Sequence, residues 1–182
     1  MKLLKYFIFI LPILLLLNAC VGDVDFDQAN DLEFTPRFKI ALVYFKLHDT
    51  DFIDQVTNDP VPLRLDFTNV DVFNNTDTSD KLEKAVLKFE IENTFNKDFT
   101  IDYILMDEND NALLTIPFTI NQNENKTIDI TYLKGTEDFE NLIKTTKIMV
   151  IGNLLPNANT TNQQMFIHFK SVVDLYLNVK DV

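Results

Sequence analysis

The chain has 182 residues, of which 46% are hydrophobic, and its formal net charge is −12 at pH 7. This acidic balance excludes nucleic acid and anionic lipid headgroups as partners, because their phosphates require a surface of the opposite charge. A single cysteine excludes a disulfide framework, so the fold depends on a hydrophobic core that we expect to be rich in the 16 phenylalanines.

The first 19 residues have the three-part layout of a secretory signal peptide. A short basic start is followed by an apolar run, interrupted by Pro12, and by small or polar residues before Cys20. The run is too short for a membrane-spanning helix, which needs roughly 20 apolar residues. We therefore predict that residues 1–19 are removed. Their loss takes away two lysines and no acid, so the net charge changes from −12 to −14.

The end of this segment resembles the lipobox of bacterial lipoproteins, in which a peptidase cuts before an acylated cysteine. Leu17, Ala19 and Cys20 match that pattern, whereas Asn18 departs from the usual small residue. The resemblance implies a diacylglycerol on Cys20 and a further acyl group on the new amino terminus. Two or more acyl chains anchor a protein stably in a membrane. The alternative is an ordinary secreted protein with a free thiol at Cys20.

An acidic segment, residues 20–34, follows the lipobox. It contains Asp23, Asp25 and Asp27, and no basic residue lies between Cys20 and Arg37. Such a segment buries too little apolar surface to offset the entropy of ordering it, so we predict a flexible tether. The acids also resemble the export signal that sends lipoproteins of Bacteroidota to the outer face of the outer membrane, which implies cell-surface display. The periplasmic face of that membrane and a plain solvated linker are the alternatives.

Residues 35–182 form one predicted domain in which the dominant hydrophobic period is two, as is typical of β-strands. The first strand, 38–45, is expected to be covered on both faces for part of its length. In the next strand, 63–72, the alternation changes parity near Asn69, which predicts a bulge or a short turn. Further strands are expected at residues 85–92, 99–106, 114–120 and 128–132.

Two features interrupt this alternation. Pro117 has no backbone N–H to donate to a ladder, so its strand is expected at a sheet edge or at a bulge. Thr136 is a predicted N-cap for a short helix over residues 137–145, which has acids in its first turn and apolar residues at helical spacing. Two further strands, 147–151 and the long 165–179, close the domain.

Seven or eight antiparallel strands with one short helix predict an all-β fold, an immunoglobulin-like two-layer antiparallel β-sandwich. The stretch from Val86 to Tyr132 resembles the immunoglobulin-like sandwiches of the late-embryogenesis-abundant, or water-stress, type. A strand ends at Asn93, a polar turn follows, and the next strand leads to an acidic turn. The usual Asn-Pro pair is here Asn93–Thr94. The resemblance implies a fold and no activity.

The turn DENDNA begins at Asp107 and has the opening spacing of an EF-hand calcium loop. Asp107, Asn109 and Asn111 are weak candidate calcium ligands, but Ala112 and Phe118 stand where the loop needs glycine and a bidentate glutamate. The same residue types are favoured in a turn between strands, because Asn and Asp tolerate left-handed backbone angles. Both interpretations stay open, and no resident metal is predicted.

The chain has two histidines, His48 and His168, which lie far apart in the sequence. Such residues are more often surface or core residues than metal ligands. Because His48 lies beside Asp49 and Asp51, a site of histidine and carboxylates is the alternative.

The sequence holds no recognisable arrangement for nucleophilic catalysis. Ser79 lies in a polar loop and Ser171 in a strand, and neither has the context of a nucleophile elbow. A glycosidase cleft is typically lined by aromatic rings, whereas this chain has no tryptophan and four tyrosines after residue 19. We therefore predict that the protein is not an enzyme and uses no cofactor.

The predicted function is that of a non-catalytic lipoprotein, anchored in the outer membrane through acylated Cys20, that acts as a structural or interaction module with a protein partner of the envelope. A surface-exposed glycan- or peptide-binding lipoprotein is the alternative. That alternative requires an exposed row of aromatic rings or a deep concave pocket. Catalysis would require two carboxylates, or a histidine and an acid, that converge in a cleft.

Overall fold

Antiparallel strands make up most of the computed structural model, which describes residues 34–52, 54, 56–57, 59, 63–73, 75–154 and 165–179. The strands are β1 (Arg37–His48), β2 (Leu63–Asn69), β3 (Leu82–Asn93), β4 (Phe99–Met106), β5 (Ala112–Ile120), β6 (Asn125–Leu133), β7 (Lys147–Leu154) and β8 (Phe166–Leu177). The helical segments are η2 (Asp49–Phe52), α2 (Thr76–Ser79) and α3 (Glu137–Ile143). Residues Thr35–Val179 form one compact unit.

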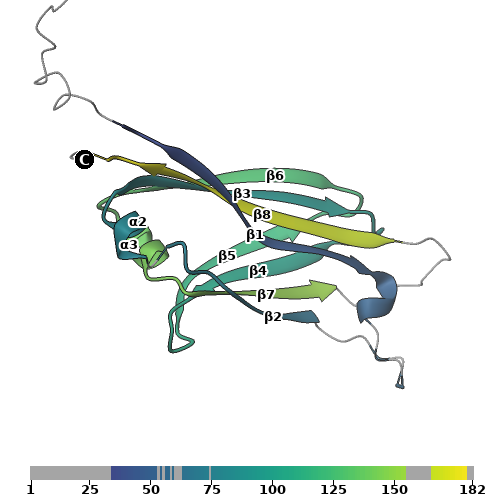
Figure 1. Cartoon of the computed structure of the whole chain (residues 1–182). Helices are drawn as coiled ribbons and strands as arrows, with labels where there is room; N and C mark the ends of the chain where they lie inside the picture. Colours follow the sequence, from purple (N-terminus) through teal and green to yellow (C-terminus); the bar gives the residue numbers. More distant parts are fainter. Residues whose placement is uncertain are drawn as a thin grey trace, which may run out of the picture. The chain divides into compact units, whose positions relative to one another are not determined.

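The strands form two four-stranded antiparallel sheets that face each other as two layers (Figure 1). One sheet has the order β1-β8-β3-β6 and the other has the order β2-β7-β4-β5. Strand β1 pairs with β8, β2 with β7, β3 with β6 and β4 with β5, as in one long hairpin folded over itself. This is the strand order of a jelly roll. The prediction of an all-β, two-layer antiparallel sandwich with one short helix is confirmed.

The connectivity differs from the immunoglobulin-like arrangement that the sequence resemblance implied. In an immunoglobulin domain the first two strands are neighbours in one sheet, whereas here β1 and β2 belong to different sheets. Among the described strands, β4 and β5 are the one pair that is consecutive in the chain and adjacent in a sheet. Side chains alternate in the same way in both arrangements, so the hydrophobic period does not reveal which sheet a strand joins.

Aromatic rings fill the centre of the space between the sheets, as the phenylalanine content predicted. Phe89, Tyr103, Phe118 and Phe169 contact one another with ring centroids 4.7 to 6.3 Å apart. Burial of one such side chain stabilises the fold by about 1.5 to 3 kcal/mol. Each ring pair adds about 0.5 to 1.5 kcal/mol. This cluster therefore holds the two layers together without any covalent cross-link.

A bulge in β1 turns its middle residues around. The register with β8 shifts between Ala41 and Val43, so Leu42 and Val43 are both buried and Tyr44 points outward with 69% of its surface exposed. The N–H of Val43 donates a hydrogen bond of 3.1 Å to the hydroxyl oxygen of Ser171. A side chain thus replaces the ladder partner at the bulge. Strict alternation would place Tyr44 on the same face as Leu42.

The other local predictions hold with small shifts. The register of β2 is irregular between Leu65 and Thr68, just before the parity change predicted near Asn69. Pro117 is exposed in β5, which lies at the edge of its sheet as predicted. The hydroxyl of Thr136 accepts a hydrogen bond from the N–H of Phe139 at 3.3 Å and caps α3, which ends two residues before the predicted boundary.

Asn93 ties two turns together from a buried position. Its amide group donates to the carbonyl oxygens of Lys97 (2.8 Å) and Asn121 (2.9 Å), and its side-chain oxygen accepts from the N–H of Phe95 (2.9 Å). Both the amide nitrogen and the side-chain oxygen of this buried residue therefore have hydrogen-bond partners. The polar turn after β3 is thereby attached to the turn between β5 and β6.

Candidate interaction surface on one sheet

The outer face of the β1-β8-β3-β6 sheet, which points away from the core, carries a set of paired charges. The ammonium group of Lys170 lies 3.0 Å from the carboxylate of Glu90, and that of Lys88 lies 3.6 Å from the carboxylate of Asp129. These pairs join side chains on adjacent strands and are partly exposed, so each contributes little to stability. Within each pair the two opposite charges neutralise each other.

One acid on this outer face is buried. The side chain of Asp174 is 1% exposed. Its Oδ2 atom accepts a hydrogen bond of 2.6 Å from Arg37 and lies 3.2 Å from the ammonium group of Lys88. Burial by itself raises the pKa of this carboxyl, but the hydrogen bonds and charges of Arg37 and Lys88 outweigh it and hold the pKa below its ordinary value. Asp174 is therefore an ionised group beneath two cationic side chains.

A strip of rings lies along β1 and β8 on the same outer face, and we call Tyr44, His48, Phe166 and His168 the ring strip. The rings of Tyr44 and His168 are 5.1 Å apart in an edge-to-face arrangement, and those of His48 and Phe166 are 6.3 Å apart. The ammonium group of Lys46 lies 3.6 Å from the centre of the Phe166 ring, within the range of a cation–π contact. Tyr44, with 69% of its surface exposed, and His48 are the exposed members.

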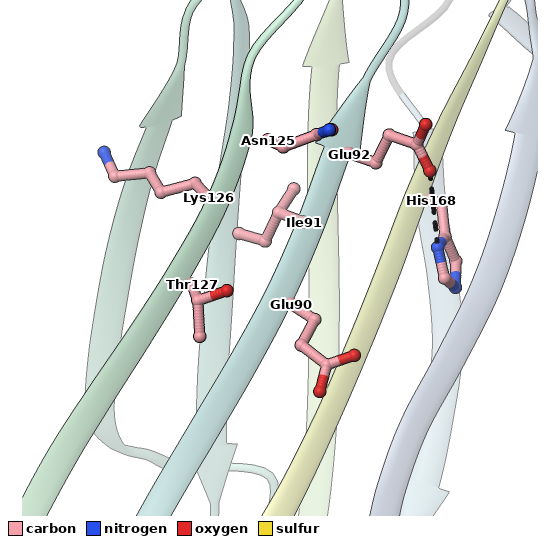
Figure 2. A pocket seen from close by; sticks show the side chains of 7 residues that line it. All are labelled: Glu90, Ile91, Glu92, Asn125, Lys126, Thr127 and His168. Atoms are coloured by element: carbon pink, nitrogen blue, oxygen red, sulfur yellow. Dashed lines mark ion pairs between the residues drawn. The ribbon is translucent and has the colours of Figure 1, made fainter.

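Beside the ring strip lies a shallow depression of about 240 Å³ (Figure 2). It is lined from β3, β6 and β8 by Glu90, Ile91, Glu92, Asn125, Lys126, Thr127 and His168. Figure 2 shows the carboxylate of Glu92 facing the imidazole of His168, and the atoms Oε2 and Nδ1 are 4.0 Å apart. The volume is below the roughly 300 to 1,000 Å³ of typical small-molecule pockets. Its carboxylates, amide and hydroxyl suit polar contacts with a larger surface.

A second depression, of about 400 Å³, lies where the β4–β5 turn meets α2 and α3. Its lining includes Asp107 and Asn109, two of the candidate calcium ligands, together with Lys144 at the end of α3. The ammonium group of Lys144 would oppose the binding of a cation there. The lining residues outside the turn are Ser79, Leu113, Ile143, Lys144 and Thr146, so this wall brings no acidic ligand to it.

The hydrogen bonds of the DENDNA turn agree with the turn interpretation of this segment. The Oδ1 atom of Asp107 accepts from the backbone N–H of Asn109 (2.9 Å) and Asn111 (2.8 Å), and its Oδ2 atom accepts from the Asn111 amide (2.9 Å). These bonds, led by that of the Asn111 side chain, lower the pKa of Asp107. Asp110 adopts a left-handed φ of 65° and pairs with Lys147 at 2.6 Å. The side chains of Asp107 and Asp110 are thus already engaged within the protein.

The two histidines lie on the ring strip rather than in a group of metal ligands. His48 is exposed, and the carboxylate of Asp51 accepts a hydrogen bond from its backbone N–H at 2.8 Å. Within the described ranges, no group of three or more His, Cys, Asp or Glu side chains could hold a metal ion. The contact of His168 with Glu92 was missed from the sequence, because it depends on β3 and β8 being neighbours.

The remaining sequence-predicted positions lie near the start of the chain. Cys20, Asp23, Asp25 and Asp27 lie outside the described residues, as do the predicted signal peptide and all of the tether except Phe34. No helix in the part of the chain that the structure describes is long and apolar enough to cross a membrane.

Comparisons with known proteins give matches to solved structures at low identity and low TM-score. No family model matches the chain, and no curated protein matches it. The infectious bursal disease virus VP2 subviral particle matches at 7% identity and a TM-score of 0.44, with 79% of this chain and 32% of that chain covered. This chain thus spans about a third of the length of the infectious bursal disease virus chains that it matches.

Two further solved structures cover different shares of their own chains. Desmodium yellow mottle tymovirus matches at 9% identity and a TM-score of 0.35, over 83% of this chain and 90% of that chain. A protein of Parabacteroides distasonis, described as secreted, matches at 14% identity and a TM-score of 0.39, over 79% of this chain and 38% of that chain. Identities and TM-scores this low carry no information about activity or partners.

Proposed function

We propose that the protein is a non-catalytic lipoprotein of the bacterial outer envelope that acts as an interaction module, with the outer face of the β1-β8-β3-β6 sheet as its contact surface. The observation that carries this proposal is the exposure of Tyr44 among paired charges on that face. Tyrosine is enriched at protein interfaces because its ring supplies contact area and its hydroxyl supplies a hydrogen bond. The surrounding ion pairs form a polar rim.

The geometry of the ionisable groups on this face supports contact rather than catalysis. His168 and Glu92 are 4.0 Å apart, which is longer than a hydrogen bond, and they lie in an open depression rather than in a site that excludes water. Asp174 is ionised and engaged with two cations, so it is not poised as a general base. These features favour a face that binds without reacting.

Anchoring through acylated Cys20 is the second part of the proposal and rests on the lipobox. Changing Cys20→Ala is expected to yield an uncleaved or soluble chain that leaves the detergent phase in which membrane lipoproteins partition, because no acyl chain is attached. The measurement is phase partitioning of the full chain. A Cys20→Ala variant that still fractionates as a mature acylated species would refute the lipobox interpretation.

Display on the cell surface is the third part and rests on the acidic segment. Replacement of Asp23, Asp25 and Asp27 by Ala is expected to keep lipidation while protecting the domain from protease added to whole cells. Replacement of Asp77, Asp80 and Asp110, three exposed acids within the domain, is the matched control. Equal proteolysis of the wild type and the variant at 23, 25 and 27 would remove the export role of these acids.

The contact face can be tested by photo-crosslinking in intact cells. A photoreactive residue at Tyr44 is expected to capture one discrete envelope protein, because this side chain projects from the proposed surface. The same residue at Thr115, which is exposed on β5 in the other sheet, is the control. A product of the same size and yield from both positions would argue against a contact surface on the β1-β8-β3-β6 sheet.

Glycan or peptide binding is the second candidate, and one observation favours it. The exposed ring of Tyr44 packs on His168, which itself lines a depression containing Glu92 and Asn125. An aromatic ring can stack on a sugar, and neighbouring carboxylate and amide groups can accept hydrogen bonds from the sugar hydroxyls. In this case Tyr44→Ala and Glu92→Gln would abolish retention on envelope polysaccharide, whereas Thr115→Ala would not. Equal retention of all variants would exclude it.

A further inference from the structure

The two sheets end in four edge strands, which are β1 and β6 in one sheet and β2 and β5 in the other (Figure 1). An edge strand presents unpaired backbone N–H and C=O groups, to which a strand of another chain can be added. Proteins commonly prevent this with bulges, prolines or charged side chains on the edge. The four edges can therefore be compared by what interrupts each of them.

Three of these edges are interrupted. The bulge between Ala41 and Val43 breaks the register of β1, and the irregularity between Leu65 and Thr68 breaks that of β2. Pro117 leaves β5 without one backbone N–H donor, and the register of β4 with β5 shifts between Leu105 and Met106. In contrast, β6 pairs with β3 at nine consecutive positions without a register shift, and its sequence NKTIDITYL contains no proline. Among the described strands, β6 is the uninterrupted edge.

The side chains along β6 leave room for an added strand. Ile128 and Ile130 pack on the core but are half-buried, and Leu133 is 52% exposed. Lys126 points inward at the start of the strand, where its ammonium group donates to the carbonyl oxygen of Thr119 on β5 at 3.1 Å. That lysine therefore disfavours the addition of a strand at one end of β6 only. A further strand would cover the two isoleucines and satisfy the open backbone groups.

We propose that a second copy of the chain is the occupant, so that two β6 strands pair antiparallel about a two-fold axis centred on Ile128. In this register Thr127 lies opposite Asp129 of the second copy, and Lys126 lies opposite Ile130. No like charges are directly opposed. The register centred on Asp129 would place two aspartates face to face, which is destabilising. An isologous pair of this kind joins two four-stranded sheets into one continuous sheet.

The net charge of the chain predicts how this pairing depends on the salt concentration. Each copy is strongly acidic, so two copies repel each other at long range, while the strand pairing itself depends on backbone hydrogen bonds and apolar contact. Added salt screens the repulsion. The dimer is therefore expected to strengthen as the salt concentration rises, unlike a complex held together by opposite charges. This pairing does not depend on the proposed contact surface or on lipidation.

The first test is cysteine cross-linking of the full chain in its native membranes. Ile128→Cys places one thiol at the proposed two-fold, where directly opposite Cβ atoms are about 4.5 to 5.5 Å apart. Oxidation is expected to give a covalent homodimer on a non-reducing gel. The wild-type chain measures the background from Cys20, and Thr115→Cys on the β5 edge is the matched control. Cross-linking no greater than in these controls, or a product with a different polypeptide, would overturn the proposal.

The second test determines the register and leaves the isoleucines in place. Thr127 is exposed, so Thr127→Lys would face Asp129 of the second copy with an opposite charge, and Thr127→Asp with a like charge. The two-fold axis doubles each pair, so the association constant of the purified full chain in detergent should rise or fall about two- to thirty-fold, respectively. The same changes at Thr115 are the control. Shifts in the same direction for both Thr127 variants, or shifts matched by the Thr115 control variants, would overturn the proposed pairing.

Discussion

The two faces of β8 differ in burial. The core face is buried along its whole length, whereas burial on the outer face changes from one end of the strand to the other. The residues on its core face are all buried: Ile167, Phe169, Ser171, Val173 and Leu175. On its outer face Val172 and Asp174 are buried as well, whereas His168 and Lys170 are partly exposed. Alternation along a strand therefore assigns side chains to faces but does not by itself determine their burial.

The difference arises from the neighbours of β8. As a central strand it is flanked by β1 and β3, whose long side chains Arg37 and Lys88 converge on Asp174 from both sides. Long cationic side chains can cover a neighbour with their aliphatic parts and keep their charged ends near water. The outer face is therefore closed at the end of the strand near Asp174 and open at the end near His168.

The core face should give the largest loss of stability. Phe169→Ala removes a ring that contacts three other buried aromatic rings and leaves a cavity, so we expect the free energy of unfolding to fall by about 3 to 5 kcal/mol. Leu175→Ala on the same face should cost about 2 to 5 kcal/mol. Denaturant midpoints of the purified chain measure both. A loss under about 1 kcal/mol in either variant would contradict the packing described for this face.

The buried acid of the outer face should give an intermediate loss. Asp174→Ala leaves two cations without their shared partner, and we expect a cost of about 1 to 3 kcal/mol. The cost stays below that of breaking a fully buried pair because the Arg37 side chain is 53% exposed and can turn toward water. Thermal and denaturant unfolding check this value. An effect as small as that of a surface residue would show that the burial of Asp174 has little energetic consequence.

The same acid predicts a pH dependence of stability. The pKa of Asp174 is lowered in the folded state, so its contribution is fully present above the unfolded pKa, about 3.9, and is lost as the pH falls through the folded pKa. The difference in unfolding free energy between the wild type and Asp174→Asn should therefore shrink below about pH 4. Urea unfolding at pH 7 and at pH 3 measures it. A difference that grows in acid would reverse the assigned direction.

The open part of the outer face should give the smallest effect. Lys170→Ala removes one partly exposed ion pair with Glu90, and we expect a change of about 0.5 kcal/mol or less. The variant is also the matched control for Phe169→Ala, its neighbour in the strand. Comparable losses at both positions would mean that the two faces of β8 do not differ in burial.

Local structure was largely predictable because it depends on neighbouring residues in the chain. The period of two located the strands, Thr136 located the start of α3, and Pro117 marked an edge strand. The candidate surface was not predictable in the same way. Tyr44 projects outward because a bulge reverses its parity, and His168 meets Glu92 because β3 and β8 are adjacent. Neither fact leaves a signal in the local pattern.

The sequence by itself determined that the domain is a two-layer antiparallel sandwich with an aromatic core, because alternating apolar residues without disulfides can be buried in few other ways. The tertiary structure alone decided that the strands follow the jelly-roll order β1-β8-β3-β6 and β2-β7-β4-β5. The physical reason is that alternation specifies which side of a strand faces the core, whereas strand order depends on contacts between residues far apart in the chain. The edges, and with them the proposed pairing of β6, follow from that order.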